Sequence, residues 1–392
     1  MQDVFILSGA RTPIASFLGA LSTVPAPKLG ATAIRAALQR AGLEPEQIEQ
    51  VVMGNVLQAG IGQAPARQAG IAAGIPYSAG AVTVHKVCGS GLKSVMYAAN
   101  DIRCGEYGIA VAGGMENMSL APYLLPNGRT GYRMGNGQVL DHMVFDGLWD
   151  PYGDKHMGNC AETCVRHFGF SREAQDEFAK TSYERALAAS QDGTFAAEIT
   201  PVEVPGRRGA VTVVEVDEEP GRANLDKMAK LRPAFDREGS VTAANSSKIN
   251  DGAAALVVAS EAKASELGVK PLARIIAQGS FAQEPEWFTT APAGAIRLVL
   301  ERAGMSIGDI DLFEINEAFA AVALAAISEL ELSSDKVNVH GGAVALGHPI
   351  GASGARILVT LLNALEKHQK RIGCASLCIG GGEAAAMIVE RL

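Results

Sequence analysis

An internal repeat constrains the fold of this chain more than any other feature of its sequence. Residues 33–48, AIRAALQRAGLEPEQI, and residues 295–310, AIRLVLERAGMSIGDI, are identical at eight of sixteen aligned positions. Each segment has apolar residues at helical spacing and contains the sequence Arg-Ala-Gly. Each is followed by an apolar stretch that ends in an asparagine, Asn55 in the first copy and Asn316 in the second. A repeat of this kind predicts two halves that fold alike.

Two further matches occur in the same order along the chain. Residues 83–95 resemble residues 338–358, since each runs from a β-rich segment through a Gly/Ser turn into a helix. Residues 108–118 resemble residues 374–387, since each is a short apolar strand that ends in glycines. A single match could arise because α/β proteins reuse similar helices, but three ordered matches favour duplication.

The alternation of strands and helices within each half predicts an α/β protein with mixed or parallel sheets covered by helices. Between the halves, residues 119–250 are richer in Pro, Gly, Tyr and charged residues. We interpret this region as a long insertion that serves binding or assembly. It contains one clear helical segment, for which Ser171 is a suitable N-cap.

Composition excludes several classes of protein. The net charge is -8 and basic residues are not clustered, so we expect no nucleic-acid partner. No apolar run is long enough to span a membrane, and the N-terminus lacks the features of a signal peptide. Six cysteines in 392 residues do not form a disulfide framework, which indicates a reducing, cytoplasmic location. Their CxxxC spacings are not those of a usual zinc site.

Cys88 is the first candidate for chemistry. It lies at a predicted strand-to-helix turn, and the helix that follows begins near Leu92. A thiol near a helix N-terminus has a lowered pKa, which favours the nucleophilic thiolate. Gly89 and Gly91 allow the backbone to approach a ligand closely. The alternative is a buried structural cysteine, the commoner fate of an isolated one.

Three other residues are candidates on weaker grounds. His348 lies in a turn rich in Gly and Pro, where it is either a surface histidine or a general base for a thiol. Asn316 ends a strand before a helix, and its amide is either an N-cap or a group that positions water or an oxyanion. Cys378 ends a strand before glycines, and it is either a core residue or a proton-transfer group. None of these signals is decisive alone.

Together, however, the segments that contain these residues resemble the four signature segments of thiolases, in the order of that family. These segments are CGSG at 88–91, NEAF at 316–319, GHPIGASG at 347–354 and CIGGG at 378–382. The resemblance extends over the whole chain through SGARTPIA at 8–15, GGMENMS at 113–119, HMG at 156–158, KLRPAF at 230–235 and INDGAAA at 249–255.

The resemblance implies a role for each catalytic candidate. Cys88 is the nucleophile that becomes acylated, and His348 activates it. Cys378 is the acid/base that removes or returns the α-proton of the second acyl group. Asn316 holds a water that forms one oxyanion hole with His348, and the backbone N–H groups of Cys88 and Gly380 form the other. Such a reaction passes through an acyl-cysteine with ping-pong kinetics.

The resemblance also implies a fold and an assembly. The thiolase fold packs two duplicated mixed-sheet α/β halves in an αβαβα arrangement with an inserted loop domain. We assign residues 1–118 and 251–268 to the N-terminal half, 119–250 to the loop domain and 269–392 to the C-terminal half. The expected state is a homotetramer or homodimer. Acetyl-CoA, acetoacetyl-CoA and CoA are the expected ligands, with no cofactor beyond these thioesters and no metal.

The residues that match the short acyl pocket of acetoacetyl-CoA thiolases favour that activity. They are Leu148, His156, Met157, Phe235 and Phe319, while Ala243 and Ser247 match contacts of the CoA arm. Phe288 narrows the pocket further if it points inward. A degradative 3-ketoacyl-CoA thiolase of broader range is the alternative. The chain departs from the family at His85, Lys248, His340 and Glu383, and also at Pro220 and Lys227, where Arg and Ser often contact CoA.

Three other classes are disfavoured. A decarboxylating ketoacyl synthase uses a cysteine with two histidines, whereas the last motif here offers Cys378. A non-catalytic CoA-binding scaffold would not need Cys88, His348 and Cys378 together. A nucleotide-binding dehydrogenase would carry GxGxxG after the first strand, where this chain has SGARTP.

Overall fold

A ten-stranded mixed sheet runs through the computed structural model, which describes residues 2–392, so Met1 of the predicted N-terminal half lies outside the described residues. The strand order is β14-β15-β16-β13-β1-β12-β5-β3-β4, and the short β2 pairs with β12. The strands are β1 (Val4–Arg11), β2 (Ala15–Ser16), β3 (Gln50–Gly54), β4 (Gly80–Val84), β5 (Ile109–Asn117), β12 (Asn250–Ser260), β13 (Ala273–Ala282), β14 (Leu312–Ile315), β15 (Ile372–Ile379) and β16 (Glu383–Arg391).

The sheet consists of two copies of one strand arrangement, as the internal repeat predicts. The first half has the order β1-β12-β5-β3 and the second has β13-β16-β15-β14. In each half the last two strands are parallel and the others are antiparallel. The halves join where β1 pairs with β13 at two positions, Phe5 with Arg274 and Ile6 with Ala273.

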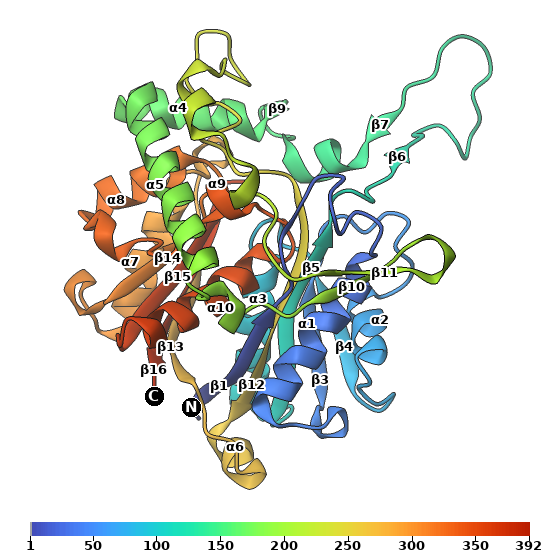
Figure 1. Ribbon diagram of the computed structural model, residues 1–392, viewed down its shortest axis with the longest axis vertical. Coiled ribbons are helices and arrows are strands. Elements are labelled where there is room, and N and C mark those ends of the chain that lie inside the picture. Colours follow the sequence, from blue (N-terminus) through green and yellow to red (C-terminus); the bar gives the residue numbers. More distant parts are fainter. Residues whose placement is uncertain (1) are drawn as a thin grey trace.

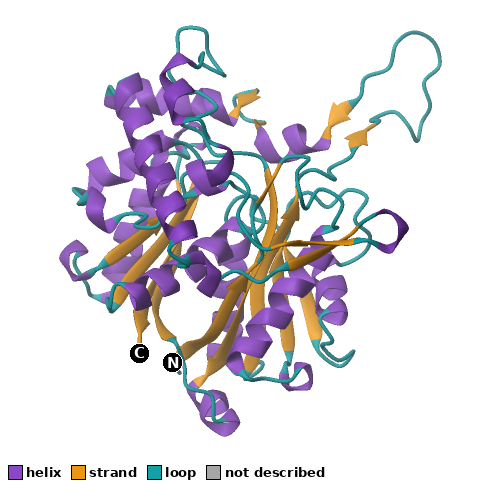
Figure 2. Cartoon of the chain, in the orientation of Figure 1, coloured by secondary structure: helices purple, strands orange, loops and turns teal. Residues whose placement is uncertain are grey.

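Helices cover the strands in three layers, which confirms the predicted αβαβα arrangement (Figures 1 and 2). On the outside of the first half lie α1 (Ala26–Ala41) and α2 (Pro65–Ala72), and on the outside of the second lie α7 (Ala291–Ala303) and α8 (Ala320–Leu330). The central layer holds α3 (Ser90–Cys104) and α10 (Ser353–Lys367), whose apolar side chains share one core with strands of both halves. The short α6 (Glu261–Leu267) connects β12 to β13.

Glycines let the two central helices meet at their N-termini. A Cβ added at Gly91 would lie 2.7 Å from the backbone nitrogen of Ala355. A Cβ added at Gly354 would lie 2.3 Å from the backbone nitrogen of Leu92. Any larger residue would therefore push the helices apart. This contact brings together the loops that precede α3 and α10, which contain Cys88 and His348.

The region between β5 and β12 forms an excursion from the layered core (Figure 1). Its helices are α4 (Met157–Phe168) and α5 (Arg172–Gln191), and the Ser171 side chain caps α5 by accepting a hydrogen bond from the Ala174 amide, as predicted. Its strand pairs are β6 (Tyr123–Leu124) with β7 (Leu140–Asp141), β8 (Trp149–Asp150) with β9 (Lys155–His156), and β10 (Val202–Pro205) with β11 (Val211–Val214). The exact domain boundaries stay a prediction.

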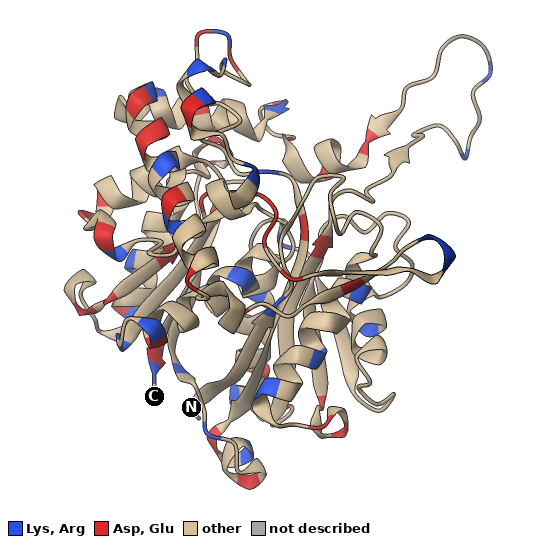
Figure 3. Cartoon of the chain, in the orientation of Figure 1, with Lys and Arg blue, Asp and Glu red and all other residues tan. Residues whose placement is uncertain are grey.

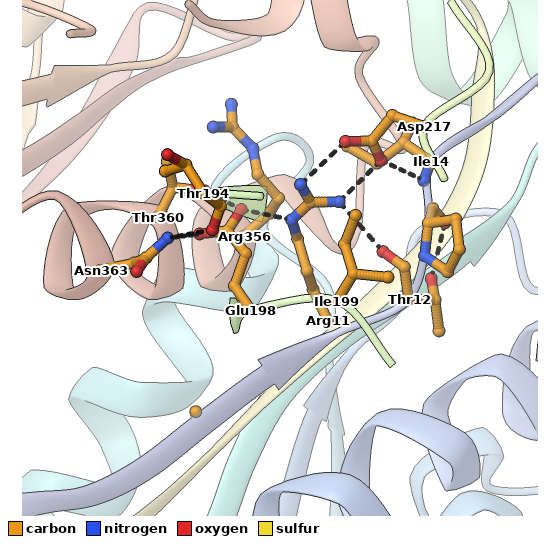
Figure 4. A network of polar contacts seen from close by, with 12 residues as sticks. Arg11, Thr12, Ile14, Thr194, Glu198, Ile199, Asp217, Arg356, Thr360 and Asn363 are labelled. Atoms are coloured by element: carbon orange, nitrogen blue, oxygen red, sulfur yellow. Dashed lines mark hydrogen bonds and ion pairs between the residues drawn. The ribbon is translucent and has the colours of Figure 1, made fainter. Parts of the chain in front are cut away.

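A buried ion-pair network fastens this excursion to the core (Figure 4). The Arg11 guanidinium, at the end of β1, donates to Glu198 at 2.6 Å and to both carboxylate oxygens of Asp217 at 2.7 and 2.8 Å. Thr360 and Asn363 of α10 also donate to Glu198. All three charged side chains are buried, so the network fixes two points of the excursion against β1 and α10.

Charged residues of both signs are interspersed along α5 (Figure 3). Within residues 2–392, no helix is both long enough and apolar enough to cross a lipid bilayer.

Candidate active site

A cavity of about 640 Å³ opens beside the N-termini of α3 and α10. It is lined by segments from both halves and from the excursion. Every residue that the sequence analysis proposed for catalysis or binding lines this cavity, except Cys378 and Asn316. The lining set comprises Cys88, Leu148, His156, Met157, Phe235, Ala243, Ser247, Phe319, His348 and Gly380.

A constrained turn between β4 and α3 presents Cys88 to the cavity. The preceding residue, Val87, has a φ of 44°, a left-handed conformation that is unfavourable for a β-branched residue. The Ser90 hydroxyl braces the turn because it accepts a hydrogen bond from the Lys86 amide at 2.8 Å and donates to the Val87 carbonyl at 2.7 Å. Backbone strain that is held in this way is characteristic of functional sites.

Burial keeps the Cys88 thiol protonated. Burial raises the pKa of Cys88 to about 11, although the backbone N–H groups of Gly380 and of Cys88 itself act in the opposite direction. The expectation that the helix N-terminus favours a resting thiolate is therefore wrong, because the loss of solvent outweighs the stabilisation by backbone donors. These two N–H groups lie at the Cys88 sulfur, and their role as an oxyanion hole stays a prediction.

Hydrogen bonds around His348 define the tautomer of its imidazole ring. Its Nδ1 lies 2.5 Å from the Ser353 hydroxyl oxygen. The Ser353 hydroxyl oxygen also lies 2.9 Å from the Pro349 carbonyl oxygen. We assign its single proton to that carbonyl, and the proton of the shorter bond to His348 Nδ1. Nε2 is then an unprotonated acceptor, and it has no hydrogen-bond partner among the described residues. This nitrogen is available as a general base.

Hydrogen bonds to Asn250 and Lys248 hold the loop that carries His348 in place. The His348 amide donates to the Asn250 side chain at 2.9 Å and lies 3.2 Å from the Lys248 carbonyl. Gly347 has a φ of 103°, and a Cβ there would lie 2.2 Å from the Asn250 side chain. Burial and the nearby Arg356 guanidinium lower the pKa of His348 to about 3. The imidazole is therefore neutral at physiological pH and can accept a proton from the neutral thiol.

Asn316 lies behind His348 rather than on the cavity wall. It follows β14 and is fully buried. Its amide nitrogen lies 3.5 Å from His348 Nδ1, too far to compete with the Ser353 contact. Its amide oxygen accepts a hydrogen bond from Arg356 at 3.3 Å. The structure thus brings Asn316 next to His348, and its role in holding a water stays a prediction.

Cys378 is the second-last residue of β15, and it is fully buried. Burial raises the pKa of its thiol well above the usual value, and the proximity of Cys88 raises it further. After Cys378 the chain turns through Gly381 and Gly382, whose φ values of 92° and 83° suit glycine. The turn aims the Gly380 amide at Cys88, so both thiols and this amide lie together.

The inner wall of the cavity is apolar and aromatic. Phe319 lies at its centre, with ring centroids 6.0 Å from Phe235 and 6.4 Å from Phe288. Phe288 is buried and points into the cavity, which is the condition under which we expected it to narrow the pocket. Met157, the first residue of α4, joins the same cluster as Cys378. These side chains close the inner end of the cavity.

The remaining predicted binding residues lie along the same cavity. His156 stacks on Phe235 at 4.8 Å and caps α4, with its Nδ1 accepting a hydrogen bond from the Gly158 amide. Burial lowers the pKa of His156, so its ring is neutral. Ser247 is fixed by a hydrogen bond from its amide to the Ala318 carbonyl at 3.0 Å, and Ala243 is exposed at the wall.

Several contributors were not found from the sequence. Ser353, which sets the tautomer of His348, lies within the GHPIGASG motif, so its distance of five residues from the histidine was an available signal. Arg356, one helical turn further on, gave no signal because its partner Glu314 lies on another element. Arg222 and Glu219 line the cavity mouth from a segment with no motif. Among residues 2–392, no group of three or more His, Cys, Asp or Glu is placed to hold a metal ion.

Known proteins resemble this chain along its whole length. The family of thiolase N-terminal domains matches residues 4–262, and that of thiolase C-terminal domains matches residues 269–391. An acetyl-CoA acetyltransferase of Cupriavidus necator is 53% identical over 392 residues, which is 100% of both chains. Acetyl-CoA acetyltransferase 2 of Arabidopsis thaliana is 52% identical over 393 residues, covering 100% of this chain and 98% of the relative.

A solved structure agrees with this placement. The Acat5 thiolase from Ascaris suum, crystallised in complex with coenzyme A, superposes with a TM-score of 0.95 at 44% sequence identity, with full coverage of both chains. On the matched domains, the full-length relatives and the shared fold, this chain belongs to the thiolase family.

Proposed function

We propose that this thiolase catalyses the reversible Claisen condensation of two acetyl-CoA molecules to acetoacetyl-CoA and CoA. The observation that carries the proposal is a neutral Cys88–His348 pair at an apolar pocket that aromatic side chains close at its inner end. Full-length relatives named acetyl-CoA acetyltransferase and a related thiolase that binds coenzyme A support the same substrates.

The first half-reaction transfers an acetyl group to Cys88. His348 Nε2 accepts the thiol proton as the sulfur attacks the thioester carbonyl of acetyl-CoA. The backbone N–H groups of Cys88 and Gly380 stabilise the oxyanion that develops. The carbon–sulfur bond to CoA then breaks, and the CoA thiolate takes the proton from His348. The products are acetyl-Cys88 and free CoA, so the imidazole is again neutral.

The second half-reaction forms the carbon–carbon bond. His348 accepts the proton of the Cys378 thiol, and the resulting thiolate removes a proton from the methyl group of a second acetyl-CoA. The enolate oxygen is stabilised next to His348 and a water held by Asn316. The enolate carbon attacks the carbonyl of acetyl-Cys88, acetoacetyl-CoA forms, and Cys88 leaves as a thiolate. The protonated His348 then returns its proton to the Cys88 thiolate, so both thiols are protonated and the imidazole is neutral before the next cycle.

The inner wall limits the acyl chain. Phe235, Phe288 and Phe319 form an aromatic cluster, and Met157 packs against it. Such a wall suits an acetyl or acetoacetyl group. Relatives at about half identity over the full length are acetyl-CoA acetyltransferases, so the alternative of a degradative 3-ketoacyl-CoA thiolase is not favoured.

The assembly and location are part of the proposal. A homotetramer or homodimer is supported by apolar side chains that are exposed on the β6–β7 hairpin, namely Leu125, Tyr132, Met134 and Val139. A cytoplasmic location is supported by the six cysteines, all of which are free thiols. Sedimentation equilibrium of purified protein tests the assembly, and a monomer at micromolar concentration would contradict it.

CoA-dependent thiolysis of 3-ketoacyl-CoAs of increasing chain length tests the function. We expect activity with acetoacetyl-CoA that falls steeply as the chain lengthens. Activity that rises with chain length would favour the degradative alternative. Absence of thiolysis at every length, with the fold intact, would reject thiolase activity altogether.

A further inference from the structure

Lys248 occupies an unusual place beside the active site. The residue follows Ser247 and lines the cavity. Its ammonium group turns away from the cavity and into the protein, where Nζ donates to the carbonyl oxygens of Ser246 at 2.8 Å and Val344 at 3.2 Å. Nζ also lies 5.5 Å from the centre of the Tyr183 ring. The aliphatic part of Lys248 therefore forms cavity wall, while its charge is enclosed behind that wall.

Lys248 holds both ends of the segment that leads to His348. Its side chain bonds to the carbonyl of Val344, which lies in the one-turn helix α9 (Ala343–Leu346). Its own carbonyl lies 3.2 Å from the amide nitrogen of His348, which also donates to Asn250. Between these points the chain passes through Gly347 in a left-handed conformation. Lys248 thus contacts both ends of the five-residue segment 344–348.

Two carboxylates complete this arrangement. Glu317 accepts a hydrogen bond from the Val344 amide at 3.0 Å, so the Val344 residue is held by Glu317 at its N–H and by Lys248 at its carbonyl. Glu219, at the cavity mouth, accepts from the Asn250 side chain at 3.2 Å. Burial lowers the pKa of Lys248 to about 8, while these two carboxylates act in the opposite direction. Glu219, Glu317 and the phenol of Tyr183 are the ionisable groups around Nζ.

We propose that Lys248 is a positioning residue for His348, which holds the 344–348 segment so that Nε2 faces the Cys88 thiol. The inference rests on the proposed function, because it holds that the rigidity of residues 344–348 serves catalysis by His348. The ammonium form donates to the Val344 carbonyl more strongly than the neutral amine does, and the charges of Glu219 and Glu317 favour it. The imidazole is therefore best held while Lys248 is protonated, below about pH 8.

Substitution of Lys248 tests the proposal in the full-length enzyme with acetoacetyl-CoA and CoA. In K248M the stem remains and the charge is lost, and we expect kcat to fall about tenfold or more with KM changed less than about twofold, since small displacements of a catalytic group are costly. K248R keeps a donor that stays protonated at every working pH, so its kcat should recover. K336M is the matched control, because Lys336 likewise donates to a buried carbonyl, that of Ile310, far from the cavity.

The pH dependence separates positioning from a merely structural role. The ratio of the wild-type rate to the K248R rate should fall as the pH rises through about 8, since only the wild type loses its charge there. This ratio cancels the ionisation of the CoA thiol, which both enzymes share. It also supports or refutes the proposal if K248M does not fold.

Three results would overturn the inference. An unchanged kcat in K248M, or a raised KM with normal kcat, would make Lys248 a wall or substrate contact only. A ratio of wild-type to K248R rate that does not change with pH would show that the charge of Lys248 does not position His348. Inactivity of the wild type itself would instead reject the proposed function, so the two failures are distinguishable.

Discussion

Replacement of His348 by asparagine tests the neutral-pair mechanism most directly. With a pKa of about 11, the Cys88 thiol is ionised in only about one molecule in ten thousand at pH 7. In the proposed mechanism the wild type escapes this limit because His348 Nε2 takes the proton as the thioester is attacked. A positioned general base of this kind contributes about 10²- to 10⁴-fold. We therefore expect H348N to slow acetylation of Cys88 by at least about 10²-fold at pH 7.

The pH dependence of H348N should differ from that of the wild type. Without the base, only the pre-formed thiolate reacts, so the acetylation rate should rise about tenfold per pH unit until about pH 11. In the wild type, His348 stays neutral down to about pH 3. The wild-type rate should therefore be nearly constant from about pH 4 to pH 9.

Rapid-quench mass spectrometry with acetyl-CoA alone measures this first half-reaction. It requires no carbon–carbon bond formation, so Cys378 does not enter the result. Cys104→Ala is the control, because Cys104 is an exposed thiol at the end of α3 and its loss should not change the rate. Acetylation of H348N at the wild-type rate, or with the wild-type pH profile, would refute the reasoning.

Three further predictions concern other parts of the site and its support. C378A should still form acetyl-Cys88 but lose condensation; loss of acetylation in a folded C378A protein would contradict the division of roles. M157A should raise kcat/KM for longer 3-ketoacyl-CoAs about tenfold relative to acetoacetyl-CoA, and an unchanged chain-length profile would show that Met157 does not limit the pocket. R11M should lower the free energy of unfolding by about 3–5 kcal/mol, because Asp217 would remain buried and unpaired; chemical denaturation measures this, and a loss below about 1 kcal/mol would mean that the network relaxes.

The layered fold was predictable because the same pattern of helices and strands occurs twice in the sequence. Residues 33–48 and 295–310 became the ends of α1 and α7 with the turns that follow, and Asn55 and Asn316 follow the corresponding strands β3 and β14. The repeat does not indicate how the two halves join. Pairing of β1 with β13 rests on two residue pairs between segments that have no shared motif, so only the folded chain reveals it.

The catalytic motifs predicted which residues meet, but not their protonation states. The position of Cys88 before α3 indicates a lowered pKa on local grounds. Its burial against the central core and against the cluster that contains Met118, Met143 and Ile350 raises the pKa instead. Burial depends on elements distant in sequence, so no local pattern reports it. The same holds for the tautomer of His348, which is set by Ser353 and by the backbone of Pro349.

A protonated resting nucleophile has a chemical advantage in this site. A permanent thiolate at Cys88 would react with any electrophile that enters the cavity. It would also require a positively charged partner, and the nearby residues do not supply one, because His348 is neutral and Arg356 is paired with Glu314. With a neutral pair, charge develops only as the sulfur attacks, and the N–H groups of Cys88 and Gly380, which we propose as the oxyanion donors, already lie at that sulfur. Reactivity is thereby tied to the presence of a thioester carbonyl in that position. The burial that makes the isolated thiol unreactive is what makes the enzyme selective.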